Sequence, residues 1–172
     1  MSNEVFLIDS NILIQPKKTY YPFDFAPGFW QQLKKHIEAG EIAILDKVMN
    51  EIQNGSDELW KWLSGINISS LITYKDTSII YKYSEVINNV KSNRCYKQSA
   101  LDEWSKNTVA DAWLIATAAV KNYTLITMET SSGIISPKSP SKNAKIPDVA
   151  NCFSVKTANL FYMMRELNFV LR

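Results

Sequence analysis

Short apolar runs alternate with segments of helical periodicity along this chain. The runs Val5–Ile8, Ile42–Leu45 and Leu125–Met128, the last interrupted only by Thr127, have the length and the largely apolar character of strands buried in a parallel sheet. Between them, apolar residues recur at spacings of three and four, as they do in amphipathic helices. Strands that alternate with helices predict an α/β fold, in which helices flank both faces of a central parallel sheet.

Capping residues and apolar spacing set the expected helix ends. One helix is expected over Asp46–Gly55, and two more over residues 76–91 and 96–106. Thr108 is expected to cap a strongly apolar helix, and Thr157 is expected to begin the last helix of the chain.

The length of 172 residues suits one domain with a full hydrophobic core. We therefore expect a single domain over 1–172, with a core of about residues 4–130 and a C-terminal extension of about residues 131–172. Ser, Pro, Lys and Gly dominate residues 131–145, which predicts a loop. The extension carries six basic and two acidic residues, whereas residues 1–130 carry 13 basic and 15 acidic residues.

Composition narrows the class of protein. Hydrophobic residues make up 46% and charged residues 21% of the chain, as in an ordinary globular protein. No apolar stretch reaches the roughly 20 residues that span a bilayer, and the first residues lack the features of a secretion signal. Cys95 and Cys152 form no paired motif and are expected to be reduced thiols. A cytoplasmic location without membrane attachment is the expectation.

Four acidic residues stand at transitions between the predicted elements. Asp9 and Glu129 each follow an apolar strand, Glu51 lies on the predicted helix Asp46–Gly55, and Asp111 falls in the first turn of an apolar helix. Each acid alone also fits an ordinary turn, cap or helix-dipole role. In open α/β sheets, however, ligands bind at the carboxyl edge, and gathered carboxylates repel one another unless a cation joins them. The pattern therefore predicts a divalent-metal site.

These acids belong to a larger pattern that resembles the PIN domain, the metal-dependent ribonuclease fold of VapC-type toxins in toxin–antitoxin modules. The resemblance covers about residues 4–130, with many relatives having Asp where Glu129 stands. The tail Ile146-Pro147-Asp148-Val149 resembles a PIN subgroup with a long C-terminal extension. The matching stretches are Leu7-Ile8-Asp9-Ser10-Asn11, Val48 with Glu51, Ala110-Asp111-Ala112-Trp113-Leu114-Ile115-Ala116, and Thr127-Met128-Glu129.

The resemblance implies a PIN-like fold and a metal-dependent endoribonuclease that hydrolyses RNA phosphodiester bonds as the toxin of a toxin–antitoxin pair. It implies RNA as the substrate, with tRNA as one candidate, a cognate antitoxin protein as a partner, and a homodimer. Oxygen ligands without paired His or Cys suit Mg²⁺ or Mn²⁺. The residues that carry over as catalytic and metal-binding are Asp9, Glu51, Asp111 and Glu129, with Asn11 and Thr127 in support.

Five lysines are candidate contacts to RNA. A basic surface beside an acidic, metal-filled cleft suits a nucleic-acid substrate. Ordinary solvated lysines explain the same positions equally well. The candidates are Lys17, Lys18, Lys138, Lys142 and Lys145.

Other enzyme classes fit the sequence less well. The single histidine, His36, leaves neither a histidine ribonuclease mechanism nor a catalytic triad available. A haloacid-dehalogenase-like phosphatase needs a second Asp where Asn11 stands, and a nucleotide-binding fold needs a glycine-rich turn after the first strand. The alternative from another class is a catalytically silent PIN-like domain that binds RNA or a protein.

Overall fold

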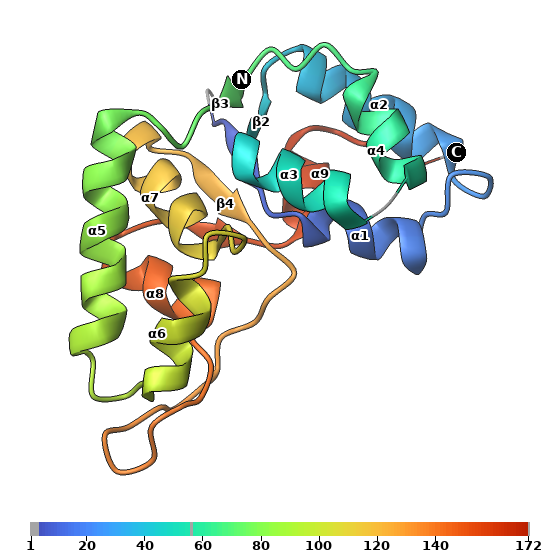
Figure 1. Ribbon diagram of the computed structural model, residues 1–172. Coiled ribbons are helices and arrows are strands. Elements are labelled where there is room, and N and C mark those ends of the chain that lie inside the picture. Colours follow the sequence, from blue (N-terminus) through green and yellow to red (C-terminus); the bar gives the residue numbers. More distant parts are fainter. Residues whose placement is uncertain (1–3, 56, 172) are drawn as a thin grey trace.

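A five-stranded, fully parallel sheet forms the centre of the computed structural model, which describes residues 4–55 and 57–171 (Figure 1). The strand order is β3-β2-β1-β4-β5, so the first strand of the chain lies in the middle of the sheet. The strands are β1 (Phe6–Ile8), β2 (Ile42–Leu45), β3 (Leu71–Ile72), β4 (Thr124–Ile126) and β5 (Thr157–Ala158).

Helices cover both faces of this sheet. Figure 1 shows α5, α6, α7 and α8 gathered on one side, and α1, α2, α3, α4 and α9 on the other. Within the described residues, no helix combines the length and the apolar character that crossing a membrane requires. The helices are α1 (Asn11–Lys18), α2 (Pro27–Glu38), α3 (Asp46–Gly55), α4 (Asp57–Ser64), α5 (Thr77–Ser92), α6 (Gln98–Trp104), α7 (Asp111–Lys121), α8 (Ile146–Cys152) and α9 (Leu160–Glu166).

The apolar runs explain why the core has this form. Every residue of β1, β2 and β4 is buried, as expected for strands covered on both faces. Helix α7 is buried from Ala112 to Ala118, which matches a helix that is apolar nearly all round. Helix α2 begins with a proline in its first turn and ends before Gly40, whose φ of 80° suits a residue without a side chain.

The strand order also fixes where a site can form. From β1 the chain crosses to β2 on one side, and β4 later pairs with β1 on the other side. The segments that follow β1 and β4 therefore leave the carboxyl edge of the sheet side by side but lead in different directions. Such a reversal of strand order is where open α/β sheets bind ligands.

The predicted sheet, its parallel direction and most helices are confirmed, but several local predictions are wrong. Thr157 does not begin a helix, because it belongs to β5 and its backbone pairs with that of Leu125 in β4. Thr108 does not cap α7, since the helix is preceded by Ala110 without a side-chain cap. The predicted strand Leu125–Met128 is β4 at Thr124–Ile126. The edge strands β3 and β5 and the helices α1 and α8 were not predicted from the sequence.

Candidate active site

Asp9 lies at the carboxyl end of the central strand and is only 3% exposed. Its backbone N–H donates to the Ile126 carbonyl at 3.0 Å, which ties it to the end of β4. The Thr127 hydroxyl donates to Asp9 Oδ2 at 3.2 Å, and the Ser10 hydroxyl lies 3.4 Å from Oδ1. These neutral donors orient the carboxylate but do not neutralise its charge. Among the described residues Asp9 has no ion-pair partner.

Asp111 is the first residue of α7 and faces the same region. In the described part of the chain its carboxylate accepts no hydrogen bond and forms no ion pair. Burial first, and then the charges of Asp9, Glu129 and Glu51, raise the pKa of Asp111 to about 7. Burial and then the charge of Glu51 raise the pKa of Asp9 to about 6, against the opposing hydrogen bond from Thr127. Both aspartates therefore keep a proton to higher pH than a solvated carboxyl group does, because they share a poorly solvated region.

Glu51 approaches the aspartates from α3. Its Oε1 accepts the backbone N–H of Ala110 at 3.0 Å, directly before Asp111. One turn earlier on α3, the Lys47 ammonium donates to the carbonyl and the side-chain oxygen of Asn107 at 2.9 and 2.7 Å. Helix α3 therefore holds the segment that leads into α7 at two points, and so positions Asp111.

Glu129 lies beyond β4 and already has a cationic partner. The Lys145 ammonium is 3.0 Å from its Oε1, and the backbone N–H of Ile146 donates to Oε2 at 2.8 Å. The backbone N–H of Glu129 donates to the Thr127 hydroxyl at 3.1 Å, so Thr127 links Glu129 to Asp9. The structure thus brings all four predicted acids into one region, with Glu129 turned toward the start of α8.

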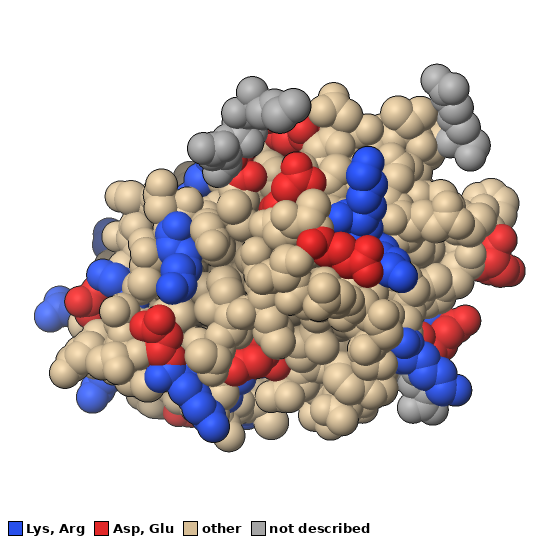
Figure 2. All heavy atoms as spheres, turned by 90° about the horizontal axis from the view of Figure 1, so that it is seen from above, with Lys and Arg blue, Asp and Glu red and all other residues tan. Residues whose placement is uncertain are grey.

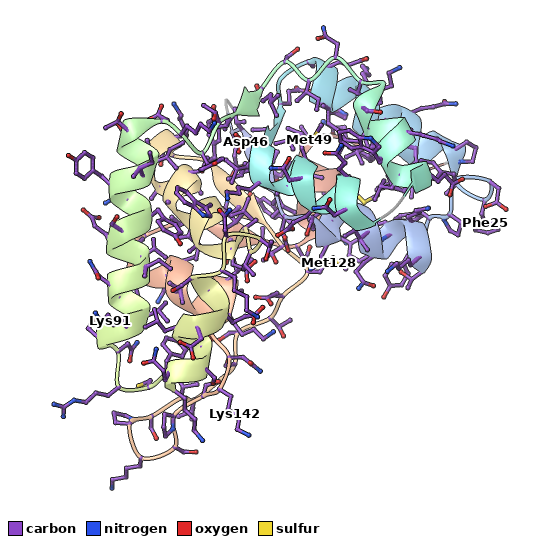
Figure 3. All side chains as sticks on the ribbon, viewed as in Figure 1. Phe25, Asp46, Met49, Lys91, Met128 and Lys142 are labelled. Atoms are coloured by element: carbon purple, nitrogen blue, oxygen red, sulfur yellow. The ribbon has the colours of Figure 1, made fainter. Side chains whose placement is uncertain are left out.

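An open recess of about 440 Å³ adjoins this region. Polar, basic and aromatic groups line it together, and Tyr20 is 56% exposed. Figure 3 labels Met128 at this place, between the two groups of helices. The lining residues are Asn11, Gln15, Tyr20, Met128, Glu129, Thr130 and Lys145.

The other candidate lysines lie elsewhere. Lys17 forms an ion pair with Glu58 at 2.9 Å and, with Lys18, lines a separate hollow against α3. Lys138 and Lys142 are exposed on the segment 131–145, and Figure 3 places Lys142 on the lower part of the molecule, away from Met128. On the face seen in Figure 2, Lys and Arg side chains are interspersed with Asp and Glu and form no continuous basic band.

The donor set fits a hard divalent cation in its chemistry. Asp9 and Asp111 are poorly solvated carboxylates, and within residues 4–55 and 57–171 neither is paired with a cation by contact. No three carboxylate, imidazole or thiol groups of the described residues are close enough to hold an ion as the side chains stand. Glu51 and Glu129 are near enough to perturb the aspartates but are engaged by Ala110, Lys145 and Ile146.

Sequence reasoning missed the role of α3 in holding Asp111. Lys47 is only 6% exposed and its ammonium lies 4.2 Å from the centre of the Tyr74 ring, so it is a buried anchor rather than a surface lysine. Its spacing of four residues from Glu51 was the available signal, since both side chains then share one side of the helix. The backbone N–H of Ala110 leaves no such signal in the sequence.

Comparisons with known proteins agree with the architecture. The crystal structure of VapBC2 from Rickettsia felis, bound to a DNA fragment from their promoter, contains a chain with a TM-score of 0.51 and 17% identity. The alignment covers 90% of this chain and 98% of that chain, and the shared fold confirms the predicted PIN-like α/β class. No curated protein sequence matches this chain. A family profile described as "Domain of unknown function (DUF4411)" matches residues 6–171, nearly the whole chain, and the protein therefore belongs to this family.

Proposed function

We propose that this protein is a metal-dependent endoribonuclease and the toxin of a toxin–antitoxin pair. The carboxylates of Asp9 and Asp111 support this activity most directly, because their poor solvation and the repulsion between their charges favour a bound divalent cation. They lie where the strand order reverses, at the edge of the sheet that suits a ligand.

We assign the ion to Asp9 and Asp111, with Glu51 assisting directly or through water. When bound, Mg²⁺ or Mn²⁺ would activate water for attack and offset charge on the phosphate that is cut. Thr127 and Ser10 keep the Asp9 carboxylate oriented. Glu51 uses Oε1 for the Ala110 amide, which leaves Oε2 for the site.

RNA is the proposed substrate because the recess beside the acids has groups that suit a nucleotide. Lys145 can pair with a phosphate, Tyr20 can stack on a base, and the Asn11 and Gln15 amides can bond to base edges. Transfer RNA is one candidate, and a homodimer remains part of the proposal. The similar chain in the VapBC2 complex supports a cognate antitoxin as the protein partner.

The second candidate is a silent domain that binds RNA or protein. Two observations favour it: Glu129 is neutralised by Lys145, and no three metal-binding side chains of the described residues converge. Metal-dependent cleavage distinguishes the two functions, since a silent domain binds without cutting.

The test is cleavage of a labelled total-RNA pool, tRNA included, with Mg²⁺, Mn²⁺ or EDTA. We expect discrete fragments that depend on the metal and disappear in Asp9→Asn and Asp111→Asn. Asp24→Asn is the matched control, because Asp24 is exposed and lies in the turn before α2. Full activity in folded Asp9→Asn would overturn the assignment of Asp9 to the metal ion. RNA that binds but stays intact in every lane would favour the silent domain.

A further inference from the structure

We infer that Lys145 is a built-in cation of this site: held by Glu129, its ammonium takes the place of a second divalent ion and contacts the substrate phosphate. The inference deepens the proposed ribonuclease function and rests on it. It assigns Glu129 to hold Lys145 rather than to bind metal, and it predicts one ion per chain.

Lys145 and Ile146 occupy the carboxylate of Glu129. Both of its carboxylate oxygens already accept a bond, one from the Lys145 ammonium at 3.0 Å and one from the Ile146 N–H at 2.8 Å. These partners are consecutive in the chain, so Glu129 fixes the end of the segment 131–145 against the end of β4. A carboxylate bonded at both oxygens by a cation and an amide would have to break these bonds in order to coordinate a metal ion.

Lys145 lies close enough to Asp111 for its charge to act on that carboxyl group. Its charge lowers the pKa of Asp111, whereas burial and the other three acids raise that pKa. Four carboxylates and one ammonium carry a formal charge of −3, which one divalent ion reduces to −1. A second divalent ion would bring the charge to +1 before RNA arrived, and it would have to displace the ammonium from Glu129.

The Lys145 ammonium is accessible to a substrate from the recess. The Lys145 side chain is 39% exposed and the Glu129 side chain is 23% exposed, and both line the recess of about 440 Å³. An ammonium whose other side faces this open space can contact a phosphate without leaving Glu129, since it has three N–H donors. Buried Lys47 has no such access, because its donors are directed to Asn107.

The chain offers a matched control pair. Lys156 and Glu4 form an ion pair at 2.7 Å with side chains 54% and 20% exposed, close to the exposures of the Lys145 pair. Glu4 precedes β1 and Lys156 precedes β5, so this pair lies at the amino edge of the sheet, opposite the site.

The experiment is a calorimetric Mn²⁺ titration of the full chain and its variants, combined with RNA cleavage kinetics. Wild type should bind one Mn²⁺, Asp9→Asn should bind none, and Glu129→Gln should retain the affinity within about threefold. Lys145→Met should bind a second Mn²⁺ that Glu129 now ligates, and its kcat/KM at low Mn²⁺ should fall about tenfold to hundredfold, the value of a charged hydrogen bond. Lys145→Arg should restore much of this loss, and Lys156→Met should behave as wild type.

Each contrary result has a separate meaning. Loss of Mn²⁺ binding in Glu129→Gln equal to that in Asp9→Asn would make Glu129 a ligand, which overturns the inference but leaves the proposed function. Two Mn²⁺ ions in wild type, or unchanged stoichiometry and kcat/KM in Lys145→Met, would overturn it in the same way. No Mn²⁺ binding to folded wild type would overturn the proposed function and the inference together. Tryptophan fluorescence in urea establishes that each variant is folded.

Discussion

Raising the pH should destabilise the metal-free protein, because the folded chain holds an aspartate that resists ionisation. Asp9 is 3% exposed, and burial with the charge of Glu51 raises its pKa from 3.8 to about 6. Between these two values the folded state binds more protons than the unfolded state. The free energy of unfolding therefore falls as the pH rises through this window, and the stabilising contribution is complete only below it.

The size of the effect follows from the two pKa values. Each unit of pKa corresponds to 1.36 kcal/mol, so the ionisation of Asp9 removes about 3 kcal/mol of stability by about pH 7. Asp9→Asn keeps the shape and removes the charge, so it should be more stable than wild type at high pH by up to this amount. For a chain of this length, that difference raises the unfolding temperature by about 6–12 °C.

Urea unfolding in EDTA, followed by tryptophan fluorescence from about pH 4 to about pH 8, measures this difference directly. The free energy of wild type relative to Asp9→Asn should fall across the range, while Asp24→Asn should follow wild type. A saturating divalent ion should recover about 3 kcal/mol in wild type at a hundredfold excess over its Kd, and nothing in Asp9→Asn. A pH-independent difference between wild type and Asp9→Asn would refute the reasoning about the buried charge.

Three further changes test individual contacts. Lys47→Met should lower the free energy of unfolding by about 1–3 kcal/mol in urea, because the two bonds from the charged ammonium to Asn107 are lost. Tyr20→Ala should weaken RNA binding of an Asp9→Asn background about fivefold to 150-fold by fluorescence anisotropy, without changing the urea midpoint. Glu51→Gln should keep the bond from Ala110 and the stability but lose Mn²⁺ affinity in calorimetry, whereas Glu51→Ala should lose both.

The buried strands were predictable because their signal is local. Four consecutive apolar residues bounded by acids mark β1 and β2 without knowledge of any partner, and β4 is marked by Leu125 and Ile126 between two threonines. The edge strands have two residues each and are only partly buried, as in Thr157 and Ala158. Their pairing depends on neighbours far along the chain, so the local sequence at Thr157 indicates a helix start rather than a strand.

The acids were predictable as a group, but their states were not. Asp9 and Asp111 are recognisable from the apolar residues around them, which is also what raises their pKa values. Glu129 carries the same local pattern as Asp9, yet its ion pair spans 16 residues of a segment without regular periodicity. Only the folded chain brings Lys145 to it.

The two lysines near the acids have different roles: Lys47 bonds to Asn107, and Lys145 pairs with Glu129. Lys47 is within electrostatic range of Glu51, but burial lowers its pKa and its ammonium is committed to Asn107 beside the Tyr74 ring. Moving it toward a ligand would break both of its bonds to Asn107, at 2.9 and 2.7 Å. Lys145 is half-exposed at the rim and neutralises one acid alone. The charge on Asp9 and Asp111 is thus left without a cationic partner among the described residues, which is the charge that the proposed divalent ion would offset.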